Sequence, residues 1–422
     1  MKRKALRYLS GNLLYAAAQF VIVVLLSKFG SAADVGRYAL GLAVTAPIFM
    51  LSHLHLRAVY IVDSSSHAHA EARDYIGLRG LTTVLAVLVT LGVIGAAGFD
   101  GQSTAVIGLI MLSRIIESIS DILFGICQKQ DKLDIVSASR AAKGLISILS
   151  IALVYIPTQS LSFALLTMII GWFVIACVFE GRAASRFVNI RPAFDRSKLS
   201  TIARKSLPLG IVLALVSLNA NLPQYAISAY LGDHELGVYA AMSYLIVACQ
   251  VVVTALGEAF TPRLASWHEA GADSQFATLM KRMIALGLAV SAAGVSVGWL
   301  FGSELLKLLF SPEMAAYTAP FRWLLLTTAF VFAGSVLWYG LVAAGLFKRQ
   351  IPLFLLTIAC NGLLCWWLVP RSGLIGAAQA ICAAWVVQTV GSFVLLRREL
   401  LRRANSRRAE NTEIHSNAQA AG

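Results

Sequence analysis

The sequence predicts an all-α polytopic membrane protein with about twelve transmembrane helices. Hydrophobic residues make up 58% of the 422 residues and charged residues only 13%, a balance far from that of soluble proteins. Mean hydropathy is +0.75. The formal net charge of +14 would suggest nucleic-acid binding in a soluble chain. Here the cations are concentrated between apolar runs, so they indicate topology and no nucleic-acid partner is expected.

Each predicted span is an apolar run of roughly membrane length. The twelve runs are 9–27, 38–56, 78–99, 104–127, 144–157, 161–179, 207–231, 237–258, 284–301, 321–347, 351–369 and 374–396. The first run follows a basic start but carries Asn12 and Gln19 and lacks a small-residue cleavage site, so it is interpreted as an uncleaved helix.

Lysine and arginine residues give the orientation. In a twelve-span arrangement they concentrate on one side, at 2–7, 57–79, 129–143, 182–205, 263–282, 348–349 and 397–408. The connections on the other side are short and hold few cations. By the positive-inside rule both termini of this multi-pass protein are predicted to be cytoplasmic.

The spans divide into two halves. Asp34-Val35-Gly36-Arg37-Tyr38-Ala39 follows the first span, and Glu235-Leu236-Gly237-Val238-Tyr239-Ala240 follows the seventh. Such a match between halves of equal orientation predicts parallel repeats. We therefore expect two six-helix lobes around a central cavity: 1–195 with its cytoplasmic linker, then 196–398, then a basic and polar cytoplasmic tail at 399–422.

The fourth span carries a polar stripe. At about 100° per residue, one narrow arc of the helix holds Arg114, Glu117, Ser118, Asp121, Gly125 and Gln128. Each charged residue costs roughly 2.5–3.5 kcal/mol near the centre of a membrane helix. The stripe is therefore expected to face a wet cavity or partner helices, which indicates a functional site. The alternative is that Arg114 and Glu117 only neutralise each other.

Other spans present polar residues toward the same expected cavity. The candidate substrate-binding residues are Arg114, Arg57, Asn12, Gln19, Asn219, Asn221, Gln224 and Gln128. For each amide the alternative is a hydrogen bond between helices, and for Arg57 it is extension toward the lipid headgroups. Otherwise the Arg57 guanidinium suits an anionic headgroup. Glu117, Asp121 and Glu258 are candidates for binding a coupling proton or Na⁺.

Several chemistries lack a signature in this chain. There is no phosphate-binding loop of an ATPase and no clustered histidine motif of a metallohydrolase. The six cysteines show neither CxxC nor metal-ligand spacing. We therefore expect no catalytic residues, no metal and no cofactor, which leaves transport without an ATPase as the predicted activity.

The chain resembles the polysaccharide transporter family, the Wzx-like oligosaccharide-lipid flippases of the multidrug/oligosaccharidyl-lipid/polysaccharide exporter superfamily. The resemblance covers most of residues 11–396 and is carried by LLSKFGSAADVGRYALGLAVTAPIFMLSHLHLR, SRIIESISDILFGICQ and AYLGDHELGVYAAMSYLI. It implies alternating access and transfer of a polyprenyl-pyrophosphate-linked oligosaccharide repeat unit across the bacterial inner membrane for O-antigen, capsule or exopolysaccharide assembly. Polysaccharide polymerase and chain-length proteins are the implied protein partners, beside the lipid bilayer itself.

The resemblance also implies a role for cavity cations, which we transfer to Arg114 and Arg57 as holding the pyrophosphate or acidic sugars. One departure concerns the seventh span, where many relatives have an acidic-Arg pair and this chain has Pro223-Gln224. Two alternatives stay open. An ion-coupled multidrug or small-molecule antiporter would prefer a cavity of net negative charge. A polysaccharide polymerase or ligase would need a larger outer loop than this chain offers.

Overall fold

The computed structural model describes residues 2–62 and 71–420, and all regular elements in this part are helices. Side chains are described for these residues except 2–9, 248–256, 258, 259, 262, 347, 348 and 404–420. The predicted all-α fold is thus confirmed.

The first half of the chain forms nine α-helices and two π-helical segments. They are α1 (Lys2–Phe29), α2 (Ala32–His53), α3 (Leu56–Val62), α4 (Ala72–Ala97), α5 (Gly101–Lys129), α6 (Leu133–Ser150), η1 (Ile151–Tyr155), α7 (Ile156–Thr158), α8 (Leu161–Val174), η2 (Ile175–Gly181) and α9 (Arg182–Ser185).

The second half contains longer helices. They are α10 (Arg196–Tyr230), α11 (Asp233–Glu269), α12 (Asp273–Leu309), the short η3 (Pro312–Tyr317), α13 (Thr318–Ala343), the short η4 (Phe347–Gln350) and α14 (Ile351–Ala420).

These helices make twelve crossings. Nine helical stretches of the described chain are long and apolar enough to span a membrane, and the last of them, Ile351–Arg403, counts as one stretch. It breaks at Gly373, where φ is 57°, so it provides two crossings. The remaining two crossings are α5 and α11, of 29 and 37 residues.

The fifth crossing begins earlier than expected. The sequence indicated a short span at 144–157, but the helix runs without interruption over Leu133–Thr158. Arg140 and Lys143, interpreted from the sequence as cations of a connection, lie inside this helix. The apolar run was short because these two cations face polar partners within the protein, as shown below.

Polar side chains start several helices. The Ser31 hydroxyl accepts a hydrogen bond from the Asp34 amide (3.1 Å), and the Asp100 carboxylate accepts from the Gln102 amide (3.1 Å). Asp195 accepts from the Ser197 amide (2.9 Å). Each of these bonds satisfies an amide of the first helical turn, so α2, α5 and α10 begin where the sequence supplies the acceptor.

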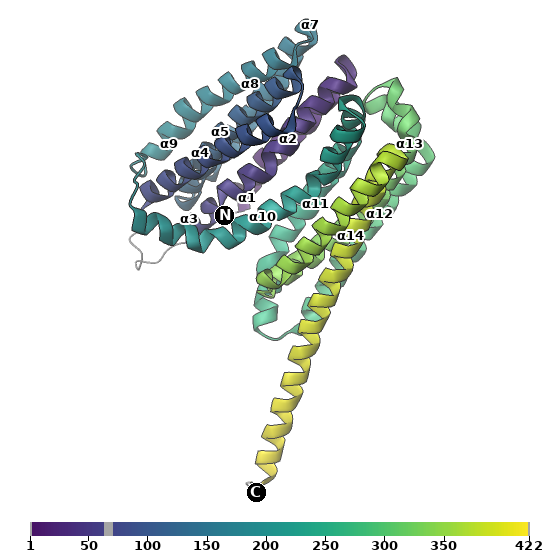
Figure 1. Cartoon of the computed structure of the whole chain (residues 1–422). Coiled ribbons are helices and arrows are strands. Elements are labelled where there is room, and N and C mark those ends of the chain that lie inside the picture. The colour runs from purple at the N-terminus through teal and green to yellow at the C-terminus, as the bar shows by residue number, and fades with distance from the viewer. Residues whose placement is uncertain (1, 63–70, 421–422) are drawn as a thin grey trace.

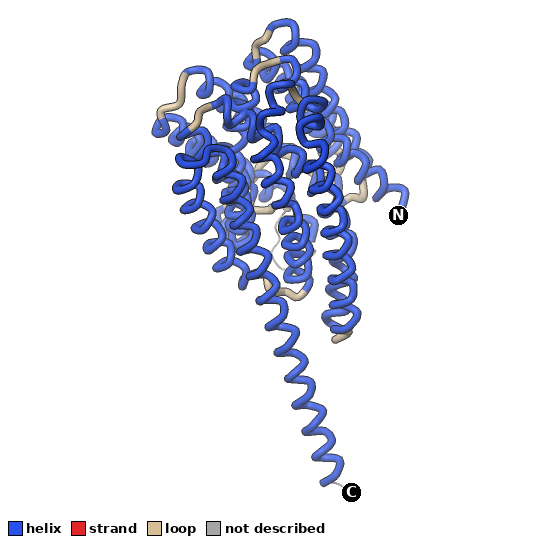
Figure 2. The backbone as a smooth tube through the Cα atoms, turned by 90° about the vertical axis from the view of Figure 1, so that its right-hand side faces the viewer, coloured by secondary structure: helices blue, strands red, loops and turns tan. Residues whose placement is uncertain are grey.

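The helices form two lobes (Figure 1). We call α1–α9 the N-lobe and α10–α14 the C-lobe. Helix α10 starts beneath the N-lobe and continues into the C-lobe, while α14 extends beyond the bundle. Figure 2 shows the helices of the bundle running lengthwise with the connections collected at its two ends. We call the end from which α14 projects the terminal end, and the opposite one the far end.

The two lobes share a hydrophobic core at the far end. That core joins Val35 and Tyr38 of α2 to Leu236 and Tyr239 of α11. Toward the terminal end the described cores are separate: one around Ile126 in the N-lobe, which also receives the start of α10, and one around Phe276 in the C-lobe. The lobes therefore share a core at the far end, whereas at the terminal end their described cores are separate apart from the start of α10.

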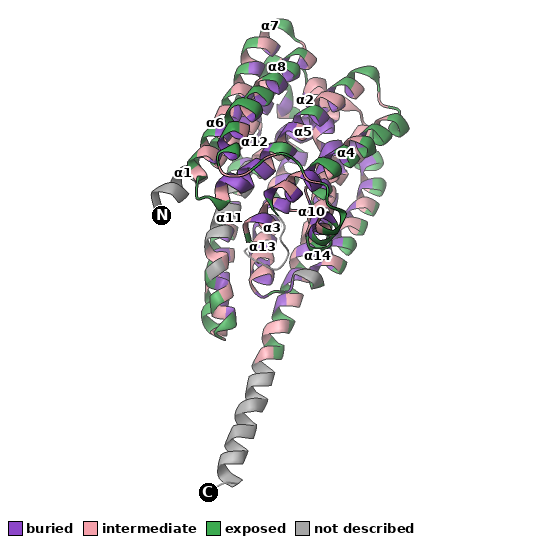
Figure 3. Cartoon of the chain, turned by 90° about the vertical axis from the view of Figure 1, so that its left-hand side faces the viewer, coloured by how far each residue is buried: buried purple, intermediate pink, exposed green. Residues whose placement is uncertain are grey.

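Exposed residues line the outer faces of the helices, and buried ones lie between them (Figure 3). Large apolar side chains such as Leu363 and Trp366 are 72% and 73% exposed. Aqueous solvent would penalise such a surface, whereas the hydrocarbon of a bilayer does not.

The repeated motif forms one contact between the lobes, at the far end. Its two copies start α2 and α11, and these helix ends pack against each other. A Cβ atom on Gly36 would lie 1.9 Å from the Asp233 carbonyl oxygen, and one on Gly237 would lie 1.7 Å from that of Ala32. Glycine is required at both positions because backbone meets backbone there.

Candidate functional site

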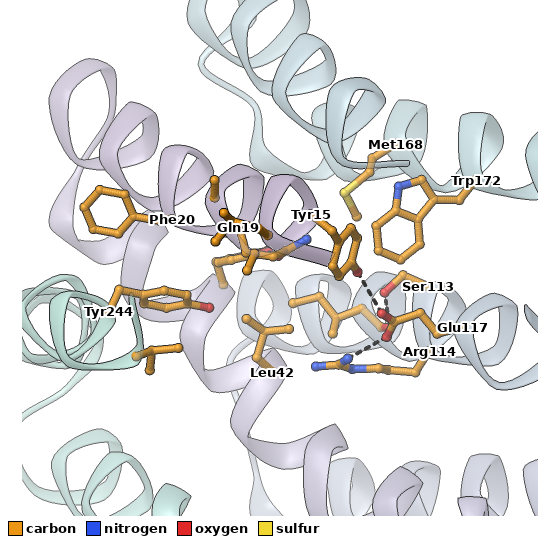
Figure 4. Close-up of a pocket in the computed structure, with 16 residues that line it drawn as sticks. Tyr15, Gln19, Phe20, Leu42, Ser113, Arg114, Glu117, Met168, Trp172 and Tyr244 are labelled. Atoms are coloured by element: carbon orange, nitrogen blue, oxygen red, sulfur yellow. Dashed lines mark hydrogen bonds and ion pairs between the residues drawn. The ribbon is translucent and has the colours of Figure 1, made fainter. Parts of the chain in front are cut away.

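A cavity of about 490 Å³ opens inside the N-lobe against α11 (Figure 4). Helices α1, α2, α5, α8 and α11 contribute its wall. The lining residues are Leu13, Tyr15, Ala16, Ala17, Gln19, Phe20, Tyr38, Leu42, Ile110, Ser113, Arg114, Glu117, Met168, Trp172, Tyr244 and Val247. Such a mostly apolar wall with few convergent polar groups is typical of a ligand site.

Arg114 and Glu117 form the charged centre of this wall. Arg114 Nη1 lies 2.6 Å from Glu117 Oε2, and the Tyr15 hydroxyl donates to Glu117 Oε1 at 2.8 Å (Figure 4). Both charged side chains are 26% exposed, so they reach the cavity. Arg114 Nη2 makes no hydrogen bond with a described residue and is not among the buried polar atoms. The pair is therefore neutralised, but the guanidinium keeps donors for a ligand.

Arg114 also lines a second cavity, of about 430 Å³, on the C-lobe side. Leu42, Tyr244 and Val247 are the other residues common to both walls. The guanidinium thus stands where the two cavities meet, between the lobes. The expected central cavity is present, with a cation at its middle.

The structure brings four of the predicted amides to cavity walls. Gln19 lines the N-lobe cavity and accepts a hydrogen bond from the Tyr38 hydroxyl at 3.3 Å. Asn221 and Gln224 line the second cavity. Asn219 lines a neighbouring pocket of about 320 Å³ in the C-lobe.

The polar stripe of α5 divides into two parts. Arg114 and Glu117 face the cavity, whereas Asp121 pairs with Arg79 of α4 at 2.7 Å and with Arg57 at 3.6 Å. Gln128 accepts a hydrogen bond from Arg57 Nη2 at 2.8 Å. Arg57, Gln128 and Asp121 do not line the cavities of 490, 430 and 320 Å³. They form a separate polar cluster nearer the terminal end.

Two cations assigned to connections from the sequence are buried instead. Arg79 is 1% exposed, and Lys143 Nζ lies 2.7 Å from Glu180 Oε1, with both of these side chains almost fully buried. Asn12, predicted to line the cavity, is bonded to Arg140 of α6. These corrections share one cause: helices α4 and α6 turn their cations inward toward acceptors on α5, η2 and α1.

The side chain of Glu258, a candidate for ion coupling, lies outside the described residues. Among the residues that the structure describes, no group of three His, Cys, Asp or Glu side chains gathers as a metal site.

Sequence reasoning did not single out three aromatic residues of the cavity walls: Trp172, Tyr244 and Trp385. Trp172 Nε1 donates to the carbonyl oxygen of Lys143 at 3.1 Å, which fixes its ring beside Tyr15. An aromatic residue in an apolar span faces lipid as readily as a cavity, so no local signal distinguishes these three.

The fold and the site define a class: a polytopic membrane protein with two helical lobes around a central cavity that holds a charged pair. A solved inward-facing multidrug MATE transporter superposes with a TM-score of 0.69 and 15% identity, over 92% of this chain and 94% of that one. The lipid II flippase MurJ, in an inward closed conformation, gives a TM-score of 0.74 and 11% identity, over 93% and 88%. Both share the twelve-crossing, two-lobe fold.

Sequence comparison gives the family. The model of the family described as "Polysaccharide biosynthesis protein" matches residues 1–268. The capsular polysaccharide biosynthesis protein CapF of Staphylococcus aureus is 25% identical over 389 residues, 92% of this chain and 97% of that protein. The chain belongs to this polysaccharide biosynthesis family and has the fold of the MATE and MurJ membrane transporters.

Proposed function

We propose that this protein is a flippase that moves a polyprenyl-pyrophosphate-linked oligosaccharide across the bacterial inner membrane for surface polysaccharide assembly. The observation that carries the proposal is the position of Arg114, a cation between two lobes with donors left over after pairing with Glu117. A guanidinium in a low-dielectric cavity suits phosphate oxygens. Family membership and the name of the CapF relative support a glycan as part of the transported molecule.

Transport proceeds by alternating access. The lobes share a core at the far end and have separate cores at the terminal end apart from the start of α10, an arrangement that suits loading from the side that carries the termini. With both termini cytoplasmic, as the cation distribution indicates, loading takes place from the cytoplasm. Closing the terminal end while parting α2 from α11 would release the lipid-linked sugar on the other side.

Glu117 links the carrier to a coupling ion. Its carboxylate and an incoming pyrophosphate compete for the same guanidinium, since Arg114 Nη1 is already 2.6 Å from Glu117 Oε2. When Glu117 takes up a proton, its carboxylate becomes neutral and the ion pair with Arg114 is lost. Arg114 then binds the phosphate instead. Departure of the phosphate restores the ion pair and expels the proton.

The test uses a deletion strain from which lipids are extracted and polyprenyl-pyrophosphate-linked oligosaccharide is quantified beside surface glycan. We expect carrier-linked repeat units to accumulate and surface glycan to fall, with both effects reversed by the wild-type gene and not by Arg114→Gln. Arg371→Gln is the matched control, because Arg371 is exposed and bonds only the Trp367 carbonyl oxygen of its own helix. Rescue by Arg114→Gln as complete as by wild type would contradict the site.

An ion-coupled antiporter is the second candidate, favoured by the likeness to the MATE structure and by the carboxylate of Glu117 in the cavity. The same strain separates the two functions. Normal lipid intermediates together with altered sensitivity to cationic drugs would replace the flippase by the antiporter.

A further inference from the structure

The C-lobe part of the cavity has a lining unlike that of the N-lobe. It consists of the 430 Å³ cavity and the 320 Å³ pocket, which share Ala220 and Trp385 in their walls. We call the two together the C-lobe pockets. Their polar lining residues, apart from Arg114 and the tyrosines, are Asn219, Asn221, Gln224, Ser243, Thr327, Ser335 and Gln388.

The amides of this lining retain hydrogen-bonding capacity. Gln224 has no side-chain hydrogen bond with any described residue. Asn221 donates to the Ser217 carbonyl oxygen at 2.7 Å, and its own side-chain oxygen stays available. Asn219 accepts from Asn361 at 3.1 Å and keeps its NH₂ group. Unsatisfied amides at membrane depth are costly, so they indicate a polar ligand.

Aromatic rings stand beside these amides. Trp385 lies in the wall common to both pockets, and Trp338 packs edge-on against Phe354 with ring centroids 5.5 Å apart. A pyranose ring presents apolar C–H faces and a rim of hydroxyl groups. Aromatic faces bind the first, and amides that both donate and accept bind the second.

Charge is missing from the C-lobe interior. The sequence has no Lys, Arg, His, Asp or Glu within 206–230, 240–257, 283–303, 323–347, 351–370 or 372–396. The sole cation lining the described C-lobe pockets is Arg114, which belongs to α5 of the N-lobe. A carboxylate on the sugar would enter these pockets without a counter-charge of its own, and burying an unpaired charge is strongly unfavourable.

We propose that the C-lobe pockets are the sugar subsite and that the sugar units they hold carry no charge, while the pyrophosphate is held by Arg114. The inference rests on the proposed flippase function and adds the substrate class: a lipid-linked oligosaccharide with neutral hexoses or N-acetylhexosamines next to the carrier. Trp385 provides the stacking face, and Gln224 and Asn221 bind the hydroxyl or acetamido groups.

The test measures binding to the full-length protein in lipid nanodiscs with three synthetic probes: polyprenyl pyrophosphate alone, the same carrier with a neutral N-acetylhexosamine–hexose disaccharide, and the carrier with a disaccharide ending in a uronic acid. The variants are Trp385→Ala and Gln224→Leu. Gln224→Leu keeps the volume of a half-buried side chain that has no hydrogen-bond partner among the described residues, so this variant should fold. It keeps the test decisive if Trp385→Ala proves unstable. Trp366→Ala is the matched control, because Trp366 lies in the other crossing of α14, is 73% exposed and does not line the C-lobe pockets.

For the wild type we expect the neutral probe to bind at least tenfold more tightly than the bare carrier, and the uronic acid probe to lose this gain. Trp385→Ala and Gln224→Leu should each remove most of the gain and leave the bare carrier unaffected, while Trp366→Ala changes nothing. Equal binding of the neutral and acidic probes would overturn the neutral class. An unchanged gain in both variants would overturn the subsite. Failure of the bare carrier to bind, or its indifference to Arg114→Gln, would instead count against the flippase function itself.

Discussion

Arg37 of α2 bridges the two lobes through Asp233 of α11, with Nε and Oδ2 3.3 Å apart. Its Nη1 also lies 3.3 Å from Asp34 Oδ1 within its own helix. Asp34 is in turn held by the Tyr155 hydroxyl at 2.8 Å, so the bridge is anchored in the N-lobe. This ion pair lies beside Gly36 and Gly237, where the helices touch. It therefore closes the far end of the cavity.

Replacing Arg37 by Gln should loosen that closure. A partly exposed ion pair contributes about 0.2–1 kcal/mol, so opening at the far end should rise roughly one and a half to fivefold. Hydrogen exchange of the backbone amides at the starts of α2 and α11 measures this opening. Glu313→Gln is the control, because it removes the His234–Glu313 pair at the same end within the C-lobe. Equal exchange in both variants would show that Arg37 does not hold the lobes together.

Replacing Gly36 by Ala should impair transport. The added Cβ would meet the Asp233 carbonyl oxygen at 1.9 Å, and backbone atoms cannot move aside as a flexible side chain does. Overpacking of this kind costs about 1–3 kcal/mol. Here it destabilises only the conformation that is closed at the far end. Surface glycan in the complemented deletion strain should fall although the protein is present in the membrane. Gly95→Ala, in open space on α4, should restore wild-type glycan levels.

Replacing Asp121 by Asn should destabilise the protein. Arg79 is 1% exposed and loses its carboxylate partner at 2.7 Å. Breaking a buried ion pair typically costs about 3–5 kcal/mol because the remaining charge is left uncompensated. Denaturant unfolding of the purified protein measures the loss. The double variant Arg79→Met with Asp121→Asn should recover most of it, and its failure to do so would favour the role in ion coupling that the sequence suggested for Asp121.

The sequence predicted what depends on periodicity along one helix. The twelve crossings follow from the apolar runs, and the repeated Gly36 and Gly237 motifs do mark equivalent helix starts that meet in space. The placement of Arg114 and Glu117 on one face follows from their spacing alone. Each of these properties is fixed before any helix packs against another.

Pairing between helices could not be predicted in the same way. Asp121 faces Arg79 because of how α4 is rotated against α5, and Lys143 faces Glu180 because η2 returns beside α6. The sequence-based topology treats each cation as unpaired and therefore places it in a connection, because an unpaired cation is unfavourable at membrane depth. It assigns both Arg79 and Lys143 to connections for this reason. Trp385 and Trp366 are equally apolar by sequence, yet one lines a cavity and the other is exposed on the outer face.

Replacing Gln224 by Arg should change the sugar preference. Gln224 lines the C-lobe cavity in a chain region without charge, so an added guanidinium would supply the counter-charge that a uronic acid lacks. Hydrogen bonds to charged groups contribute roughly 1.5–3 kcal/mol, which corresponds to tenfold or more in affinity. Binding of the uronic acid probe relative to the neutral probe should rise by about that factor. Gln102→Arg makes the same change in net charge on an exposed residue that lines none of the cavities of 490, 430 and 320 Å³, and it should leave the ratio at its wild-type value. A rise in both variants would assign the effect to overall charge, and no rise in Gln224→Arg would place the sugar elsewhere.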